Sequence, residues 1–221
     1  MRTIFEKDLK AYLTSFLTYV FMALLVGVYA TLFTIRVFNY NIINYELPVY
    51  SLTNWILTLV PITMFLVYSV QKNKRVDTHI YTSNVNSIKI AIARILAISV
   101  VYLVPTILIL LSNMFLKVFI FTNSATVITI YLFATLLILL SASFSNMMYT
   151  IFKNPLLPLL LSIIIPNGTY YLINLLGLES TIFLPYLMGL LPIGTFLIAV
   201  LTIIAFIAIT AMVLNKKRNI V

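Results

Sequence analysis

The chain has 221 residues, of which 62% are hydrophobic and only 9% charged, whereas a soluble domain carries roughly 25% charged residues. This composition excludes a soluble globular protein, and because no stretch looks like a separate soluble domain, residues 1–221 are predicted to form one membrane domain. The net charge of +9 would suggest a nucleic-acid partner for a soluble protein, but here the basic residues stand at the ends of apolar runs, where membrane topology accounts for them.

Residues 1–12 have the pattern of an amphipathic helix. Phe5, Leu9 and Tyr12 fall on one stripe at helical spacing, whereas Lys7 and the other basic residues lie elsewhere. We expect this helix to lie in the cytoplasmic membrane interface with its apolar face toward the lipid. An ordinary charged leader before the first span is the alternative.

Apolar runs of about 20 residues, long enough to cross ~30 Å of hydrocarbon, predict an all-α polytopic membrane protein with six spans. They are expected at Leu13–Phe33, Ser51–Val70, Ser87–Leu111, Ala125–Ser145, a segment that starts at Pro155, and Thr195–Leu214.

Two interruptions are predicted near the end of the chain. Pro166, Asn167 and Gly168 are expected to break the fifth span, because proline removes a helical hydrogen bond. The following stretch, Thr181–Ile193, holds two prolines and a glycine, and is expected to be a re-entrant or interfacial piece between the fifth and sixth spans.

The distribution of basic residues predicts the orientation. With six spans and both termini in the cytoplasm, only Arg36 and Lys117 of the 14 basic residues would lie outside, as the positive-inside rule requires. We therefore expect a multi-pass protein of the bacterial cytoplasmic membrane whose N-terminus is inside.

The longest polar interval, Gln71–Arg94, runs from the end of the second span into the start of the third. It carries five basic residues and the only histidine, His79. A positive segment between two spans is expected to face the cytoplasm, where a cytosolic protein would grip it as a coupling loop. A solvated topology signal without a partner is the alternative.

Several kinds of chemistry are absent from the sequence. All five acidic residues fall in loops or in the N-terminal helix, which argues against a proton relay through the spans. No H-E-x-x-H, G-x-S-x-G or G-x-x-x-x-G-K-[ST] pattern occurs and there is no cysteine, so we expect no catalytic residue, no metal site and no ATP site in this chain. Any transport energy would come from a partner or from sodium.

Three segments resemble type-2 ABC exporter permeases, specifically the gliding-motility-like branch. These are FEKDLKAYLTSFLTYVF near the N-terminus, RVDTHIYTSNVNSIKIAIARIL after the second span, and the turn from Phe144 into Pro155. The chain departs from the family pattern at Asp77, His79, Tyr81 and Asn84, and these departures bear on the detailed contacts with an ATPase.

The resemblance implies a permease half that pairs with a second half, a copy or a paralogue, in the membrane lipid. Two cytosolic ABC ATPases would bind ATP and Mg, and this chain would bind neither. The residues that the resemblance places against the ATPase are Asp77, Thr78, His79, Ile80, Tyr81, Thr82 and Ser83 in the coupling loop, Met148, Tyr149 and Lys153 in a second cytoplasmic turn, and the interfacial helix with Phe5, Lys7, Leu9 and Tyr12.

The transport pathway is assigned only as a hypothesis, with Asn146 at its inner mouth and Pro166 and Asn167 at an outer break. Apolar and aromatic spans suit an amphipathic peptide or a lipid-like cargo, and exporters of phenol-soluble-modulin-type peptides are one group with such cargo. An ATP-independent carrier or a non-transporting assembly factor is the alternative function.

Overall fold

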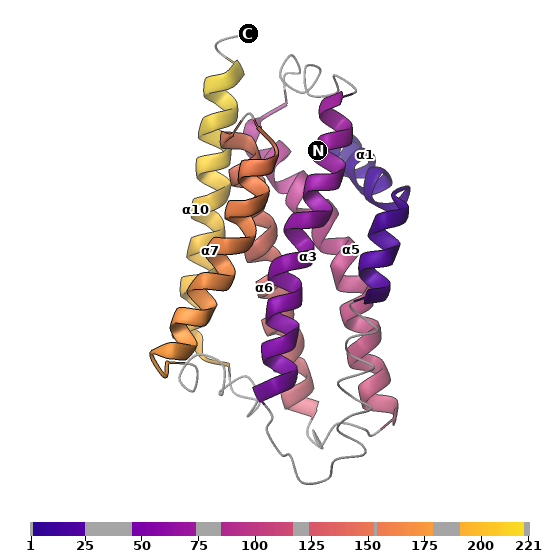
Figure 1. Ribbon diagram of the computed structural model, residues 1–221, viewed down its shortest axis with the longest axis vertical. Helices are drawn as coiled ribbons and strands as arrows, with labels where there is room; N and C mark the ends of the chain where they lie inside the picture. Colours follow the sequence, from indigo (N-terminus) through magenta and orange to yellow (C-terminus); the bar gives the residue numbers. More distant parts are fainter. Residues whose placement is uncertain are drawn as a thin grey trace.

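The computed structural model of the protein describes residues 2–24, 46–73, 85–116, 124–152, 154–178 and 191–218. Within these residues the chain is helical and contains no strand (Figure 1). The helices are α1 (Arg2–Leu13), a segment at 16–24, α3 (Glu46–Asn73), α5 (Ser87–Leu116), α6 (Ser124–Ile151), α7 (Leu156–Leu175) and α10 (Ile193–Arg218).

Four of these helices, α5, α6, α7 and α10, are long and apolar enough to cross a membrane. The α3 helix contains a shorter apolar stretch at Thr53–Tyr68. The predicted all-α fold is therefore confirmed for the described residues, with four helices that have the length and composition of membrane spans. The α5, α6, α7 and α10 helices begin within two residues of the predicted spans, whereas α3 begins five residues earlier than predicted. The first predicted span is described only to residue 24, after a turn at Thr14 and Ser15. Six spans and two cytoplasmic termini stay predictions.

The α6 helix is the centre of the bundle. It packs against α3, α5, α7 and α10, while α1 packs mainly against α5 (Figure 1). The apolar segments of α5 and α6 are 67% and 61% buried, but those of α7 and α10 are each only 17% buried. The outer faces of α7 and α10 are therefore the apolar surface that a surrounding membrane would contact.

Polar contacts show which helix ends lie together. Ser87, at the start of α5, donates a hydrogen bond to Asn215 near the end of α10. Lys217 donates to the backbone carbonyl of Thr150 near the end of α6. We call this end of the bundle, which also holds α1 and the start of α7, the α1 end, and the opposite end the distal end (Figure 1).

Hydroxyl groups from neighbouring helices hold α3 where Pro61 interrupts its hydrogen-bond ladder. Tyr102 on α5 donates to the carbonyl of Leu59 at 2.9 Å, and Tyr149 on α6 donates to the carbonyl of Pro61 at 3.1 Å. Such side-chain bonds link neighbouring helices in membrane proteins. The apolar core packs around them, with Ile56, Val60, Met64, Ile95, Ile98, Val101 and Ile138 almost fully buried.

The predicted break in the fifth span is wrong, because α7 continues through Pro166, Asn167 and Gly168. The Asn167 side-chain amide donates a hydrogen bond to the carbonyl of Ile163 at 2.8 Å. This bond lies next to the position where Pro166 removes a backbone hydrogen bond. The predicted re-entrant stretch cannot be compared, because residues 179–190 lie outside the described residues and Ile193 already begins α10.

Candidate functional site

Arg94 is the centre of a buried polar cluster at the α1 end. It lies two turns into α5 and is only 5% exposed, although a charged group at this depth is costly without partners. Its Nη1 donates a hydrogen bond to the Tyr68 hydroxyl on α3 at 2.9 Å, and its guanidinium carbon lies 5.0 Å from the centre of the Tyr68 ring. The second contact has the geometry of a cation–π interaction.

The negative charge beside Arg94 comes from α1. Asp8 is 4% exposed, and its Oδ2 lies 3.9 Å from Nε of Arg94. Tyr12, one turn further along α1, is also buried. Burial raises the pKa of the Tyr12 phenol well above its usual range, so this side chain stays neutral and the ion pair is the charged feature of the contact.

The cluster continues from α3 into α6. The Tyr68 hydroxyl donates to Oδ1 of Asn146 at 2.7 Å, and the Tyr68 ring stacks on Tyr149 with centroids 5.0 Å apart. We call Asp8, Arg94, Tyr68, Asn146 and Tyr149 the polar layer. It joins α1, α5, α3 and α6 in one chain of contacts.

The α6 helix contains three residues, two of them in the polar layer, that the sequence analysis placed elsewhere. Met148 and Tyr149 do not lie in a cytoplasmic turn, because α6 continues to Ile151 and Tyr149 is buried against α3. Asn146 does not lie at an open mouth, because it is fully buried and bonded to Tyr68. The predicted turn is therefore wrong at Met148 and Tyr149, because the helix extends past them. A role for Asn146 in a transport pathway stays a prediction.

The N-terminal helix forms as predicted, but its apolar stripe faces protein and not lipid. Phe5 and Leu9 pack against the main core, where Tyr12 is buried, and Ile4 packs against a smaller cluster of α5 and α10 side chains. Lys7 is exposed. The expectation of an apolar face turned toward the lipid is therefore wrong, because α5 and α3 already cover it.

The seven predicted coupling residues, from Asp77 to Ser83, lie outside the described residues, as does Lys153. The helices that flank the coupling loop are described. The α3 helix ends at Asn73 and α5 begins at Ser87, so both connections to the loop leave from the α1 end, next to the polar layer.

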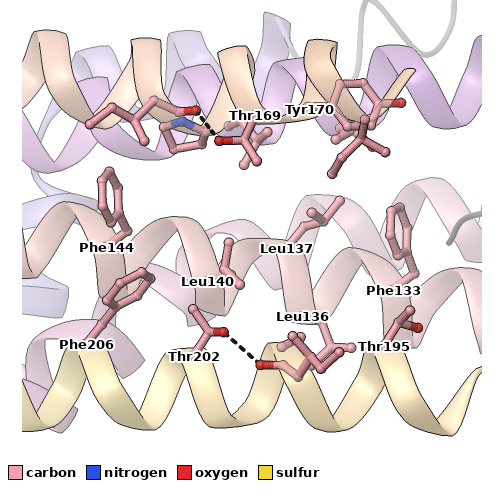
Figure 2. A pocket seen from close by; sticks show the side chains of 17 residues that line it. Phe133, Leu136, Leu137, Leu140, Phe144, Thr169, Tyr170, Thr195, Thr202 and Phe206 are labelled. Atoms are coloured by element: carbon pink, nitrogen blue, oxygen red, sulfur yellow. Dashed lines mark hydrogen bonds between the residues drawn. The ribbon is translucent and has the colours of Figure 1, made fainter. Parts of the chain in front are cut away.

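A second feature, an apolar cavity, lies toward the distal end. It has a volume of about 460 Å³ and is lined by residues of α6, α7 and α10, with two from α3. Within the described residues, α7 and α10 both pack against α6 but scarcely contact one another. Figure 2 shows Thr169 and Tyr170 of α7 on one side of this space, Thr202 of α10 on the other, and Leu137 and Leu140 of α6 between the two helices.

The two residues predicted at an outer break lie in or near this cavity wall. Pro166 lines the cavity, whereas Asn167 bonds to its own helix. The cavity has no counterpart in the sequence analysis, because it arises where two helices fail to meet. Among the described residues, no three His, Asp or Glu side chains come together as a metal site would require.

The importance of Asp8 and Arg94 was also missed, although the sequence contains a signal for it. Asp8 follows Ile4 by four residues and precedes Tyr12 by four, so it shares the buried face of α1. Arg94 stands within an apolar helical run. An acid on an apolar face and an isolated base in a span together indicate a buried pair.

Comparisons with models of known protein families, with curated proteins and with solved structures found no match.

Proposed function

We propose that this chain is a permease subunit of an exporter that a separate cytosolic ATPase drives. The observation that carries the proposal is the polar layer beside the coupling loop. Arg94 and Tyr68 lie on the two helices that flank this loop, and they bond to each other at 2.9 Å. Asp8 and Asn146 extend the connection to α1 and α6.

This arrangement suits the transmission of force from a partner. An ATPase that binds the loop more tightly in one arrangement of the bundle shifts the population toward that arrangement. Packed helices tend to move as rigid bodies between discrete arrangements. Because the polar layer connects the parts of α3 and α5 next to the loop with the central helix α6, a displacement of the loop would move the bundle as well as the loop.

The orientation follows from the charges at the α1 end. Every described Lys and Arg lies in α1 or in the part of α3, α5 or α10 that belongs to this end. The positive-inside rule supports a cytoplasmic α1 end in a bacterial cytoplasmic membrane, within reach of a cytosolic ATPase. An amphipathic peptide or a lipid-like molecule is the proposed cargo, since the exposed faces of α7 and α10 are apolar.

Co-purification from native membranes tests this proposal. We expect a P-loop ATPase to come down with the full chain in a fixed ratio. Replacement of His79, Ile80 and Tyr81 by alanine is expected to release the ATPase and leave membrane insertion intact. Lys216→Ala is the matched control, because Lys216 is exposed at the same end of the bundle but lies outside the loop.

A wild-type chain that comes down without an ATPase would contradict the proposal. An ATP-independent carrier or an assembly factor would then explain the membrane bundle, and the basic loop would serve only to set the topology.

A further inference from the structure

The cavity between α7 and α10 is lined almost entirely by apolar groups, so it has few polar atoms to which a water could bond. Three threonine hydroxyls in its wall already donate to backbone carbonyls of their own helices. Thr169 bonds to Ile165 at 2.8 Å, Thr202 bonds to Ile198 at 2.8 Å, and Thr195 bonds to the carbonyl of Pro192 at 3.0 Å (Figure 2). A buried water needs two to four polar partners, so this space favours an apolar occupant.

The length of the cavity matches one leaflet of a membrane. Its lining on α6 runs from Phe133 to Phe144, and on α10 from Thr195 to Phe206. At 1.5 Å per residue each of these stretches is about 16 Å long, and half of the hydrocarbon thickness is about 15 Å. The Phe144 and Phe206 rings, with centroids 5.2 Å apart, close the end that points toward the α1 end.

The helices on the two sides of the cavity, α7 and α10, carry the apolar surface that lipid tails would contact. The surrounding outer faces of α7 and α10 carry large exposed apolar side chains, among them Leu172 at 58%, Leu197 at 53% and Leu201 at 64% exposed. Both helices have the length and composition of membrane spans. Hydrocarbon is therefore the medium beside the cavity.

The cavity has the size of a site for one flexible chain. Its volume is about 460 Å³. A single flexible chain fits this volume, which is within the usual range of ligand pockets.

We propose that the cavity binds one acyl chain of a membrane lipid, with the end of the chain against Phe144 and Phe206. The site would take a saturated or singly unsaturated hydrocarbon chain whose headgroup stays at the distal end. This inference does not depend on the proposed exporter function, since it concerns the chain alone in a bilayer.

Photo-crosslinking tests the proposal without an ATPase. The full chain is reconstituted in phosphatidylcholine vesicles that contain a minor fraction of phosphatidylcholine with a diazirine at the end of one acyl chain. After illumination, mass spectrometry locates the label. We expect it on the cavity-facing residues Leu140, Phe144 and Phe206 severalfold more often than on Leu197 and Leu201, which face outward.

Two substitutions of the same kind on α10 make a matched pair. Ala199 lines the cavity, whereas Ala205 is exposed and does not. Ala199→Phe takes up the volume of more than two methylene groups, so labelling of the cavity is expected to fall by about tenfold or more. Ala205→Phe is expected to leave the labelling unchanged. Ala199→Leu, with a smaller side chain, is expected to give an intermediate loss and serves if the phenylalanine variant fails to fold.

The melting temperature in lipid-depleted detergent gives an independent readout. Ala199→Phe fills empty space and is expected to raise it, unlike Ala205→Phe. Labelling spread evenly over the outward faces, or labelling that Ala199→Phe and Ala199→Leu leave unchanged, would overturn the proposal. Conversion of a dimer to a monomer by Ala199→Phe, without enriched labelling in the wild type, would also overturn it and assign the cavity to an interface between copies.

Discussion

Three contacts with two neighbouring residues compensate Arg94 for the water that it loses inside the bundle. The Asp8 carboxylate supplies the opposite charge at 3.9 Å, the Tyr68 hydroxyl accepts a hydrogen bond, and the Tyr68 ring adds a cation–π contact. A buried pair of this kind adds little net stability compared with apolar residues, but removing one partner is costly because the other charge remains buried. The pair therefore fixes where α1 docks on α5.

Asp8→Asn is expected to destabilise the protein by about 3 kcal/mol, the lower end of the cost of breaking a buried pair, since 3.9 Å is a long contact. Thermal unfolding in detergent, followed by the fluorescence of Trp55, measures this loss. The combined variant Asp8→Asn/Arg94→Leu is expected to recover most of it, because no uncompensated charge is then left in the bundle.

Glu6→Gln is the control on the same helix. Glu6 pairs with Arg2 at 2.7 Å, but on the exposed face of α1, where such pairs contribute less than about 0.5 kcal/mol. Equal losses of stability for Asp8→Asn and Glu6→Gln would contradict this account, because the buried carboxylate would then contribute no more to stability than the exposed one.

At the scale of helices, the start of a helix is easier to predict from the sequence than whether the helix continues through a proline. The side chains of Asn86 and Asn154 accept the N–H groups of Ile88 and Leu156 at 2.9 and 3.0 Å. These local caps are readable from sequence, and both starts were predicted within one residue. The continuity of α7 at Pro166 was not predictable, because it depends on how side chains compensate for the disturbed bonds.

Gly177 ends α7 in a way that requires glycine. Its φ is 66°, in the left-handed region, and the N–H of Leu178 bonds back to the carbonyl of Ile173 at 3.1 Å, as in a Schellman motif. Gly177→Ala is expected to cost about 1–2 kcal/mol, the strain of a left-handed residue with a Cβ, measured by thermal unfolding in detergent.

Gly168→Ala, within the same helix, is expected to change stability in the opposite direction. A Cβ at Gly168 meets no atom within 4 Å, and alanine is favoured over glycine inside a helix by up to about 1 kcal/mol. Destabilisation of similar size by both variants would contradict this account of α7 and would favour a strained helix at Pro166 to Gly168.

At the scale of the whole molecule, hydropathy predicted the four helices that are long and apolar enough to cross a membrane, but neither the polar layer nor the apolar cavity. Both depend on which faces meet. Asn146 was assigned to an open pathway because it stands at the inner end of an apolar run, and it is buried because α6 happens to be the central helix. The cavity exists because α7 and α10 share α6 as a neighbour without packing on each other, which no local pattern in either helix records.

The orientation of the bundle can be measured directly, because the chain has no native cysteine. Lys10 and Lys216 are exposed at the α1 end, and Leu178 is 45% exposed at the distal end. In intact cells, a membrane-impermeant maleimide is expected to label Leu178→Cys and to leave Lys10→Cys and Lys216→Cys unlabelled. After permeabilisation all three are expected to react, which controls for accessibility.

The reverse pattern would place the basic α1 end outside, against the positive-inside rule, and the loop between α3 and α5 would then be out of reach of any cytosolic ATPase. Labelling of Lys10→Cys alone in intact cells would mean an odd number of membrane crossings between α1 and the end of α10, although the two lie at the same end of the bundle.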